Sequence, residues 1–149
     1  MKVKDVMSTV LVTIHKDTTY SNVVKILHEN KLSGAPVVDD AGSIVGIISE
    51  KDLFKVLYPF YNSFYTNPEL YVDFEDREKK IHEIKDHRIE KFISGEVTHA
   101  DPETPILKIG ALMLAKGISR LPVLLEGRLI GMVSREEIFN RILKNELEL

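Results

Sequence analysis

The chain of 149 residues contains no cysteine and no tryptophan. The absence of cysteine excludes disulfides, thiolate metal sites and cysteine nucleophiles, and it fits a cytoplasmic protein. Basic residues do not outnumber acidic ones, and a formal net charge of −3 argues against a general electrostatic grip on nucleic acid. No apolar run reaches the roughly 18 residues of a membrane helix, and the N-terminus lacks the apolar stretch of a secretory signal. We therefore expect neither a nucleic acid nor a membrane as a partner.

Catalytic motifs are also missing. No Gly-x-Ser-x-Gly, P-loop, Gly-x-Gly-x-x-Gly or His-Glu-x-x-His sequence occurs. The acidic pairs at 39–40 and 136–137 are better explained by a turn and by the start of a helix than by acid–base catalysis. The sequence therefore predicts a protein that is not an enzyme, requires no cofactor and holds no metal.

The chain contains an internal repeat. Residues 3–38 align without a gap on residues 89–124, and after one residue is dropped Gly46 falls on Gly131. One apolar pattern runs through both copies, in the pairs Val23/Ile109, Ile26/Leu112, Leu27/Met113, Ile47/Met132 and Ile48/Val133. Chance is a poor explanation for a pattern shared over this length.

Each copy predicts the element order β-α-β-β-α. The first copy predicts a strand at 10–14, a helix capped at Asp17-Thr18 and ended by Gly34, and strands at 35–38 and 44–48. A second helix follows, capped by Ser49, with Leu53, Phe54 and Leu57 on its inner face. The second predicts a helix from Thr104-Pro105 to Gly117, strands at 121–125 and 128–133, and a helix at 135–143. One such unit cannot cover its own sheet, so we expect an α/β (α+β) fold in which two pseudo-symmetric copies pack sheet to sheet.

Two runs, LSGAPVVDDAGSIVGIISEKDL at 32–53 and ISRLPVLLEGRLIGMVSREEIF at 118–139, resemble tandem CBS domains (named for cystathionine β-synthase), the pair called a Bateman module. The resemblance places one repeat at 1–57 and the other, with a C-terminal helix, at 89–149. It implies that the clefts between the repeats bind an adenosine-type nucleotide and that two chains pair into a homodimer.

The first candidate site lies where the strand at 44–48 meets the next helix. The backbone N–H groups at a helix start suit a phosphate, Ser49 adds a hydroxyl, and the Asp52 carboxylate suits the vicinal hydroxyls of a ribose. The alternative is purely structural, with Ser49 as the N-cap and Asp52 closing a capping box; both roles can coexist. The resemblance implies that Ser49 contacts phosphate and Asp52 contacts ribose.

The resemblance also implies that the first strand of one repeat receives the base held by the other. By position, Val97 and Thr98 then serve the Asp52 site, with Ile47 as an apolar wall. Arg120 is the basic residue expected near the phosphate, although the sequence does not decide which site it reaches. Ordinary strand packing, or a solvated arginine, is the alternative for these residues.

A second, weaker site is predicted from the equivalent positions Leu11, Val12, Met132, Ser134 and Glu137. Here Glu137 replaces the aspartate of the pattern, and its extra methylene moves the carboxylate outward. We therefore expect two unequal sites.

The insert at 58–88 has no counterpart in the repeat. It is rich in aromatic residues, namely Tyr58, Phe60, Tyr61, Phe64, Tyr65, Tyr71 and Phe74. These rings must be buried against the chain itself, a second subunit or a ligand. Residues 75–92 are charged and helix-prone, with Ile81, Ile84 and Ile89 on one side, which favours a helical strap over the first copy. A subunit contact or a lid remains the alternative.

The sequence thus predicts a regulatory sensor that binds AMP, or else ADP, ATP or S-adenosylmethionine, and signals to an effector protein. NAD and cyclic dinucleotides present similar adenosine edges. The first rival hypothesis is a CBS scaffold that binds no ligand and mediates protein–protein contacts, and the second is hydrolysis or transfer of a nucleotide.

Overall fold

The computed structural model describes residues 1–58, 78–93 and 96–149. The chain divides into two compact units. The first-repeat unit contains Thr13–Asp40 and Val45–Gly95, and the second-repeat unit contains Met1–Val12, Ala41–Ile44 and Glu96–Leu149. Residues 59–77 lie outside the described residues, and with them most of the aromatic residues on which the expectation for the insert rests.

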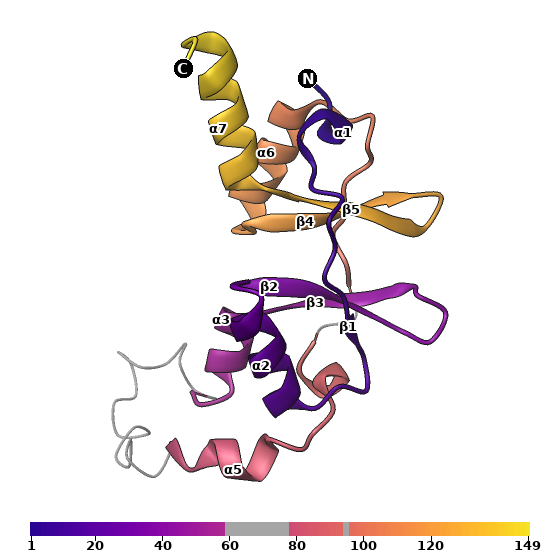
Figure 1. Ribbon diagram of the computed structural model, residues 1–149, viewed down its shortest axis with the longest axis vertical. Helices are drawn as coiled ribbons and strands as arrows, with labels where there is room; N and C mark the ends of the chain where they lie inside the picture. The colour runs from indigo at the N-terminus through magenta and orange to yellow at the C-terminus, as the bar shows by residue number, and fades with distance from the viewer. Residues whose placement is uncertain (59–77, 94–95) are drawn as a thin grey trace. The chain divides into compact units, whose positions relative to one another are not determined.

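The first-repeat unit is built on a three-stranded sheet in the order β1-β2-β3. The strand β1 runs parallel to β2, with Ile14 opposite Val37. The two longest helical segments of the repeat, α2 and α3, lie on one face of β2 and β3 (Figure 1). The elements are β1 (Ile14–His15), α2 (Tyr20–Glu29), β2 (Gly34–Val38), β3 (Ile44–Ser49), α3 (Glu50–Lys55), α5 (Lys80–Ile84) and the 3-10 helix η3 (Ile89–Phe92).

The second-repeat unit repeats this plan around an antiparallel hairpin, β4 and β5. Glu126 and Gly127 both adopt positive φ angles, 52° and 79°, as a two-residue hairpin turn requires. Helices α6 and α7 cover one face of the hairpin (Figure 1), and α6 ends at Gly117 in the left-handed conformation, as predicted. The elements are α1 (Val3–Val6), α6 (Ile106–Lys116), β4 (Arg120–Leu125), β5 (Arg128–Ser134) and α7 (Arg135–Glu146).

The first helical turn of each repeat, α1 or η3, belongs to the unit that is built on the other repeat. Val3, at the start of the first repeat, is fully buried in the core of the second-repeat unit, and its N–H donates to the Thr104 carbonyl at 2.9 Å. Ile89, the equivalent residue of the second repeat, is fully buried in the core of the first-repeat unit, and its N–H donates to the Thr18 carbonyl at 2.8 Å. Each core is therefore completed by residues from the other repeat.

Ion pairs reinforce both exchanged turns. Lys2 and Lys4 each bind Glu103, at 2.6 and 2.7 Å, and Arg88 lies 3.3 Å from Asp17 at the equivalent place. The hydrogen bonds from Lys2 and then Lys4 lower the pKa of Glu103 from 4.5 to about 2. Because these groups are exposed, solvent and salt screen the attraction, and its contribution to stability is small.

Two glycines allow the segments that follow α1 and η3 to lie close to the strands β5 and β3. A Cβ on Gly131 would meet Met7 Sδ at 2.8 Å and the Ser8 carbonyl oxygen at 2.9 Å. A Cβ on Gly46, the matching position, would meet Ile93 Cδ1 at 2.9 Å. In the second-repeat unit, Ser8 and Met132 then exchange backbone hydrogen bonds of 2.8 and 2.9 Å. The glycine of each repeat thus has a packing role that the sequence pattern alone does not disclose.

The strand expected at 10–14 is wrong in extent. Only Ile14 and His15 pair with β2, and Val10 is 86% exposed. The residues up to Val12 group with the second-repeat unit instead.

Three further details of the expected elements are corrected. The cap of α2 is Thr19, which accepts from the Asn22 N–H, rather than Asp17 or Thr18. That helix ends at Glu29 rather than at Gly34, because Lys31 adopts a left-handed φ of 53° and the Leu32 N–H closes on the Leu27 carbonyl. Phe54 was expected on an inner face but is 59% exposed, whereas Leu53 is buried.

In the second repeat, α6 begins at Ile106 with Pro105 at the N-cap, one residue later than Thr104 would place it. The following helix, α7, extends to Glu146, beyond the expected end at residue 143. No helix among the residues that the structure describes has the length and apolar character needed to cross a membrane.

Candidate functional site

The end of β3 places Ser49 and Asp52 in a closed capping box. Asp52 Oδ2 accepts from the Ser49 N–H at 3.0 Å and from the Ser49 hydroxyl at 2.8 Å, while the Asp52 N–H donates to Ser49 Oγ at 3.2 Å. The capping box, which is the structural alternative for this pair, is therefore present. All three bonds leave Asp52 Oδ1 unused, and among the described residues that oxygen has no hydrogen-bond donor. One carboxylate oxygen thus remains for another hydroxyl.

The second repeat builds the same box with a longer acid. The Ser134 N–H donates to Glu137 Oε2 at 2.9 Å, and the Glu137 N–H donates to Ser134 Oγ at 3.1 Å. Unlike Ser49, Ser134 does not donate its hydroxyl to the acid of its own box in the described part of the chain. A glutamate therefore closes the box as well as an aspartate does, but the hydroxyl and the carboxylate are arranged differently.

The sequence does not decide which of the two predicted sites Arg120 serves. It begins β4 directly opposite Ser134 in the ladder, and it belongs to the second-repeat unit. The equivalent position of the first repeat is Gly34, where an added Cβ would lie 2.8 Å from the Ile48 carbonyl oxygen. Backbone packing therefore keeps a side chain, and with it a basic group, out of this position in the first repeat.

The predicted site residues divide between the two units. Of the first set, Ile47, Ser49 and Asp52 lie in the first-repeat unit, and Val97, Thr98 and Arg120 lie in the second-repeat unit. The second set lies entirely in the second-repeat unit, as Leu11, Val12, Met132, Ser134 and Glu137. Within these sets the structure shows two capping boxes and the pairing of Arg120 with Ser134.

Sequence reasoning missed Lys116, whose ammonium group donates to Thr98 Oγ1 at 3.4 Å. The His99 ring also lies beside this segment, with Nδ1 3.5 Å from the Val97 carbonyl oxygen. A lysine in the last turn of a helix is an ordinary feature, so no motif would have singled it out.

One group of side chains has the composition of a metal site. His15, Asp17 and Asp40 offer ligand atoms within 4.8 Å of one another, and the parallel pairing of β1 with β2 brings them together from distant positions in the sequence. His15 Nε2 lies 2.6 Å from Asp40 Oδ1, and the Arg88 guanidinium lies 3.3 Å from Asp17. Since the group is largely exposed and Asp17 already faces the Arg88 guanidinium, contacts within the protein account for it.

Comparison with known proteins identifies the repeats. The family model described as CBS domain matches residues 3–59 and 89–144. A CBS domain-containing protein of Dictyostelium discoideum is 31% identical over 144 residues, which is 95% of this chain and 91% of the relative.

Solved structures share the fold. The structure of CBSX2 in complex with AMP has 24% identity and a TM-score of 0.74, and the match covers 97% of this chain and 98% of that one. A CBS domain pair in complex with 5′-methylthioadenosine and S-adenosyl-L-methionine has 23% identity and a TM-score of 0.73, with 98% of each chain covered.

Proposed function

Because the chain belongs to the CBS domain family, we propose that it is a regulatory module that binds an adenosine-type nucleotide and signals its presence to an effector protein. Two CBS pairs of the same fold were solved with AMP, and with 5′-methylthioadenosine and S-adenosyl-L-methionine, and these ligands share an adenosine group. AMP is our first candidate, since one arginine among the proposed residues suits one phosphate. ADP, ATP and S-adenosylmethionine follow it.

The observation that carries the proposal is the hydroxyl–carboxylate pair at the end of β3. Asp52 is fixed by two bonds to one oxygen, which leaves Oδ1 to accept from the vicinal hydroxyls of a ribose. The Ser49 hydroxyl donates to Asp52 and can instead turn toward a phosphate oxygen, because both are anionic acceptors. The half-buried Ile47 of the same strand supplies apolar surface.

The second-repeat unit supplies the proposed weaker site. Ser134 there keeps its hydroxyl for a ligand, and Arg120, paired with it across the ladder, supplies a positive charge for a phosphate. Glu137 replaces the shorter acid, so its fit to a ribose is poorer. That Val97 and Thr98 receive the base of one nucleotide, and Leu11 and Val12 that of the other, stays a prediction.

The chain itself suggests the test. Because Ser134 and Glu137 form an intact box, Asp52→Glu retains the cap and the charge of the first site and moves only the carboxylate. Titration calorimetry with AMP, ADP, ATP and S-adenosylmethionine, with ribose 5-phosphate as the adenine-free control, compares wild type, Asp52→Glu and Asp52→Ala. Loss of a hydrogen bond to a charged group weakens binding at least about tenfold.

We expect Asp52→Glu to weaken the stronger site by that factor, and Glu137→Asp to strengthen the weaker site. Thermal unfolding of Asp52→Glu should match wild type, which separates loss of ligand from loss of the cap. Equal affinity of all three proteins would refute the role of Asp52. Conversion of the nucleotide during the titration, followed by chromatography, would instead show that the chain is an enzyme.

A second candidate function is a CBS scaffold that binds no nucleotide. Both acids are engaged in capping boxes, and Gly34 denies the first repeat a basic side chain. If no adenosine ligand gives heat or raises the unfolding temperature, this function replaces the sensor.

A further inference from the structure

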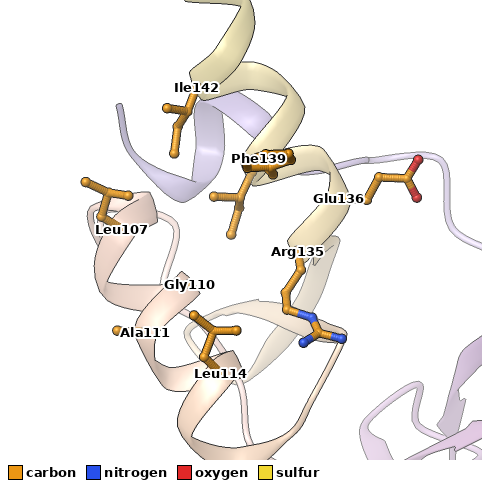
Figure 2. A pocket seen from close by; sticks show the side chains of 9 residues that line it. Leu107, Gly110, Ala111, Leu114, Arg135, Glu136, Phe139 and Ile142 are labelled. Carbon is orange, nitrogen blue, oxygen red and sulfur yellow. The ribbon is translucent and has the colours of Figure 1, made fainter. Parts of the chain in front are cut away.

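Lys116 reaches from the last turn of α6 to Thr98, within the second-repeat unit. Its ammonium group donates to Thr98 Oγ1 at 3.4 Å, and it forms no ion pair with any residue that the structure describes. Figure 2 shows Leu107 and Leu114 of the same helix lining an apolar groove against α7, and Lys116 does not belong to that lining. The contact with Thr98 is therefore separate from the apolar surface of α6.

The segment around Thr98 lies at one end of the second-repeat sheet. Ala100 pairs in parallel with Val123 of β4. Thr98 comes two residues earlier and therefore lies toward the start of β4. Arg120 and Ser134 are opposite each other at that same end. The contact with the lysine thus falls at the end of the sheet that carries the proposed binding residues of this unit.

The first repeat lacks both partners of this contact. The position equivalent to Lys116 is Asn30, whose side-chain amide donates to the Ile26 carbonyl oxygen of its own helix at 2.7 Å. The position equivalent to Thr98 is Val12, which has no hydroxyl. Since a repeat folds without the lysine and without the hydroxyl, the fold alone does not explain why the second repeat has both.

We propose that Lys116 fixes the Thr98 hydroxyl as a hydrogen-bond donor toward the base of the nucleotide, so that the base is recognised through an acceptor atom such as a purine ring nitrogen. A lysine ammonium has only donors, so the Thr98 oxygen must be the acceptor in their contact. The hydroxyl hydrogen then points away from Lys116 and remains for a ligand. A threonine without this partner accepts from the amino group of adenine as readily as it donates. Lys116 is thus a positioning residue, and its role rests on the proposed function.

The test is a double-mutant cycle measured by titration calorimetry with AMP. Lys116→Asn and Thr98→Val copy the first repeat, and Lys108→Asn, at an exposed position of the same helix, removes the same charge as a control. We expect Thr98→Val to weaken binding about two- to tenfold, which is the worth of one hydrogen bond. Lys116→Asn should weaken it about threefold, because the freed hydroxyl regains roughly three staggered orientations, and should have no further effect on Thr98→Val. Lys108→Asn should bind as wild type does.

Two other roles of these residues give different results. If the loss of affinity on Lys116→Asn persists in the Thr98→Val background and grows from AMP to ADP to ATP, Lys116 attracts phosphate and the proposal is overturned. Purine riboside 5′-monophosphate, which is AMP without the amino group, tests the direction of the hydrogen bond. Thr98→Val should weaken the binding of both ligands equally. A penalty that disappears with the second ligand would show that Thr98 accepts from the amino group.

A measurement on the chain without nucleotide separates this inference from the proposed function. In carbon–proton correlation NMR spectra, the Thr98 methyl signal should shift in Lys116→Asn and stay in place in Lys108→Asn. An unshifted signal in both variants would refute the contact, whatever the chain binds. If the contact is present but wild type binds no nucleotide, the proposed function fails and the role of Lys116 falls with it. If AMP binds and the cycle shows no coupling, this inference alone fails.

Discussion

Replacing Val3 tests whether the first residues of the chain complete the core of the second repeat. Val3 is fully buried in a cluster with residues such as Ile106, Met113 and Val133. Valine to alanine removes two methyl-sized groups, worth about 0.8 kcal/mol each, and the cavity left behind adds to the loss. We expect Val3→Ala to lower the free energy of unfolding by about 2 kcal/mol and the unfolding temperature by roughly 4–8 °C.

The control uses the same substitution a few residues away. Val10 is 86% exposed, so Val10→Ala should change the free energy of unfolding by less than about 0.5 kcal/mol. Urea titration followed by far-ultraviolet circular dichroism gives both values, provided that the slope with denaturant is unchanged. If Val3→Ala were as stable as Val10→Ala, the exchange of first turns between the repeats would be incorrect.

The remaining predictions concern close packing, a buried hydroxyl and pH. In thermal unfolding, Gly131→Ala should destabilise the protein by about 1–3 kcal/mol, since the new Cβ meets a backbone oxygen. Gly110→Ala should be neutral or stabilising by up to about 1 kcal/mol, because no atom lies within 4 Å of a Cβ at that position. Tyr20→Phe removes the 2.7 Å bond that the buried Tyr20 hydroxyl donates to the Leu53 carbonyl and should cost about 1–3 kcal/mol in urea unfolding; a loss below about 0.5 kcal/mol would argue against that bond. The pKa of Glu103, about 2, lies below its unfolded value of 4.5, so its contribution to stability is present above pH 4.5 and is lost as pH falls toward 2. Unfolding temperatures of wild type and Glu103→Gln should therefore converge in that window at low salt, and curves that stay parallel would contradict the ion pairs.

The elements that could be predicted from the sequence are those whose signals are local. The β4–β5 hairpin follows from Glu126-Gly127 between two apolar runs, and both Ser49 and Ser134 cap helices as predicted. The end of α6 at Gly117 is likewise a local conformational preference.

The features that could not be predicted depend on contacts between distant segments. The run at 10–14 has the composition of a strand, but its residues up to Val12 belong to the other unit, and only Ile14 of the run pairs with β2. Similarly, the repeat shows that Gly46 and Gly131 are equivalent positions. It does not show that Gly131 lies against the segment after α1, or Gly46 against the segment after η3. Lys31 adopts a left-handed conformation that sequence reasoning reserves for glycine, which is why the end of α2 was misplaced.

For the candidate site, the pattern predicted the residues but not their geometry. The pairing of Ser49 with Asp52 follows from their spacing, as does that of Ser134 with Glu137. The position of Arg120 opposite Ser134 required the register of the β4–β5 ladder, which a single sequence does not reveal.

The central claim, that the serine–acid pairs hold a nucleotide, is tested most directly by mapping backbone amide shifts in the NMR spectrum as AMP is added. The account predicts that the amides of residues 47–52 shift at the lowest AMP concentrations and those of residues 132–137 at higher ones. Shifts confined to other segments, or no shifts at millimolar AMP, would contradict it.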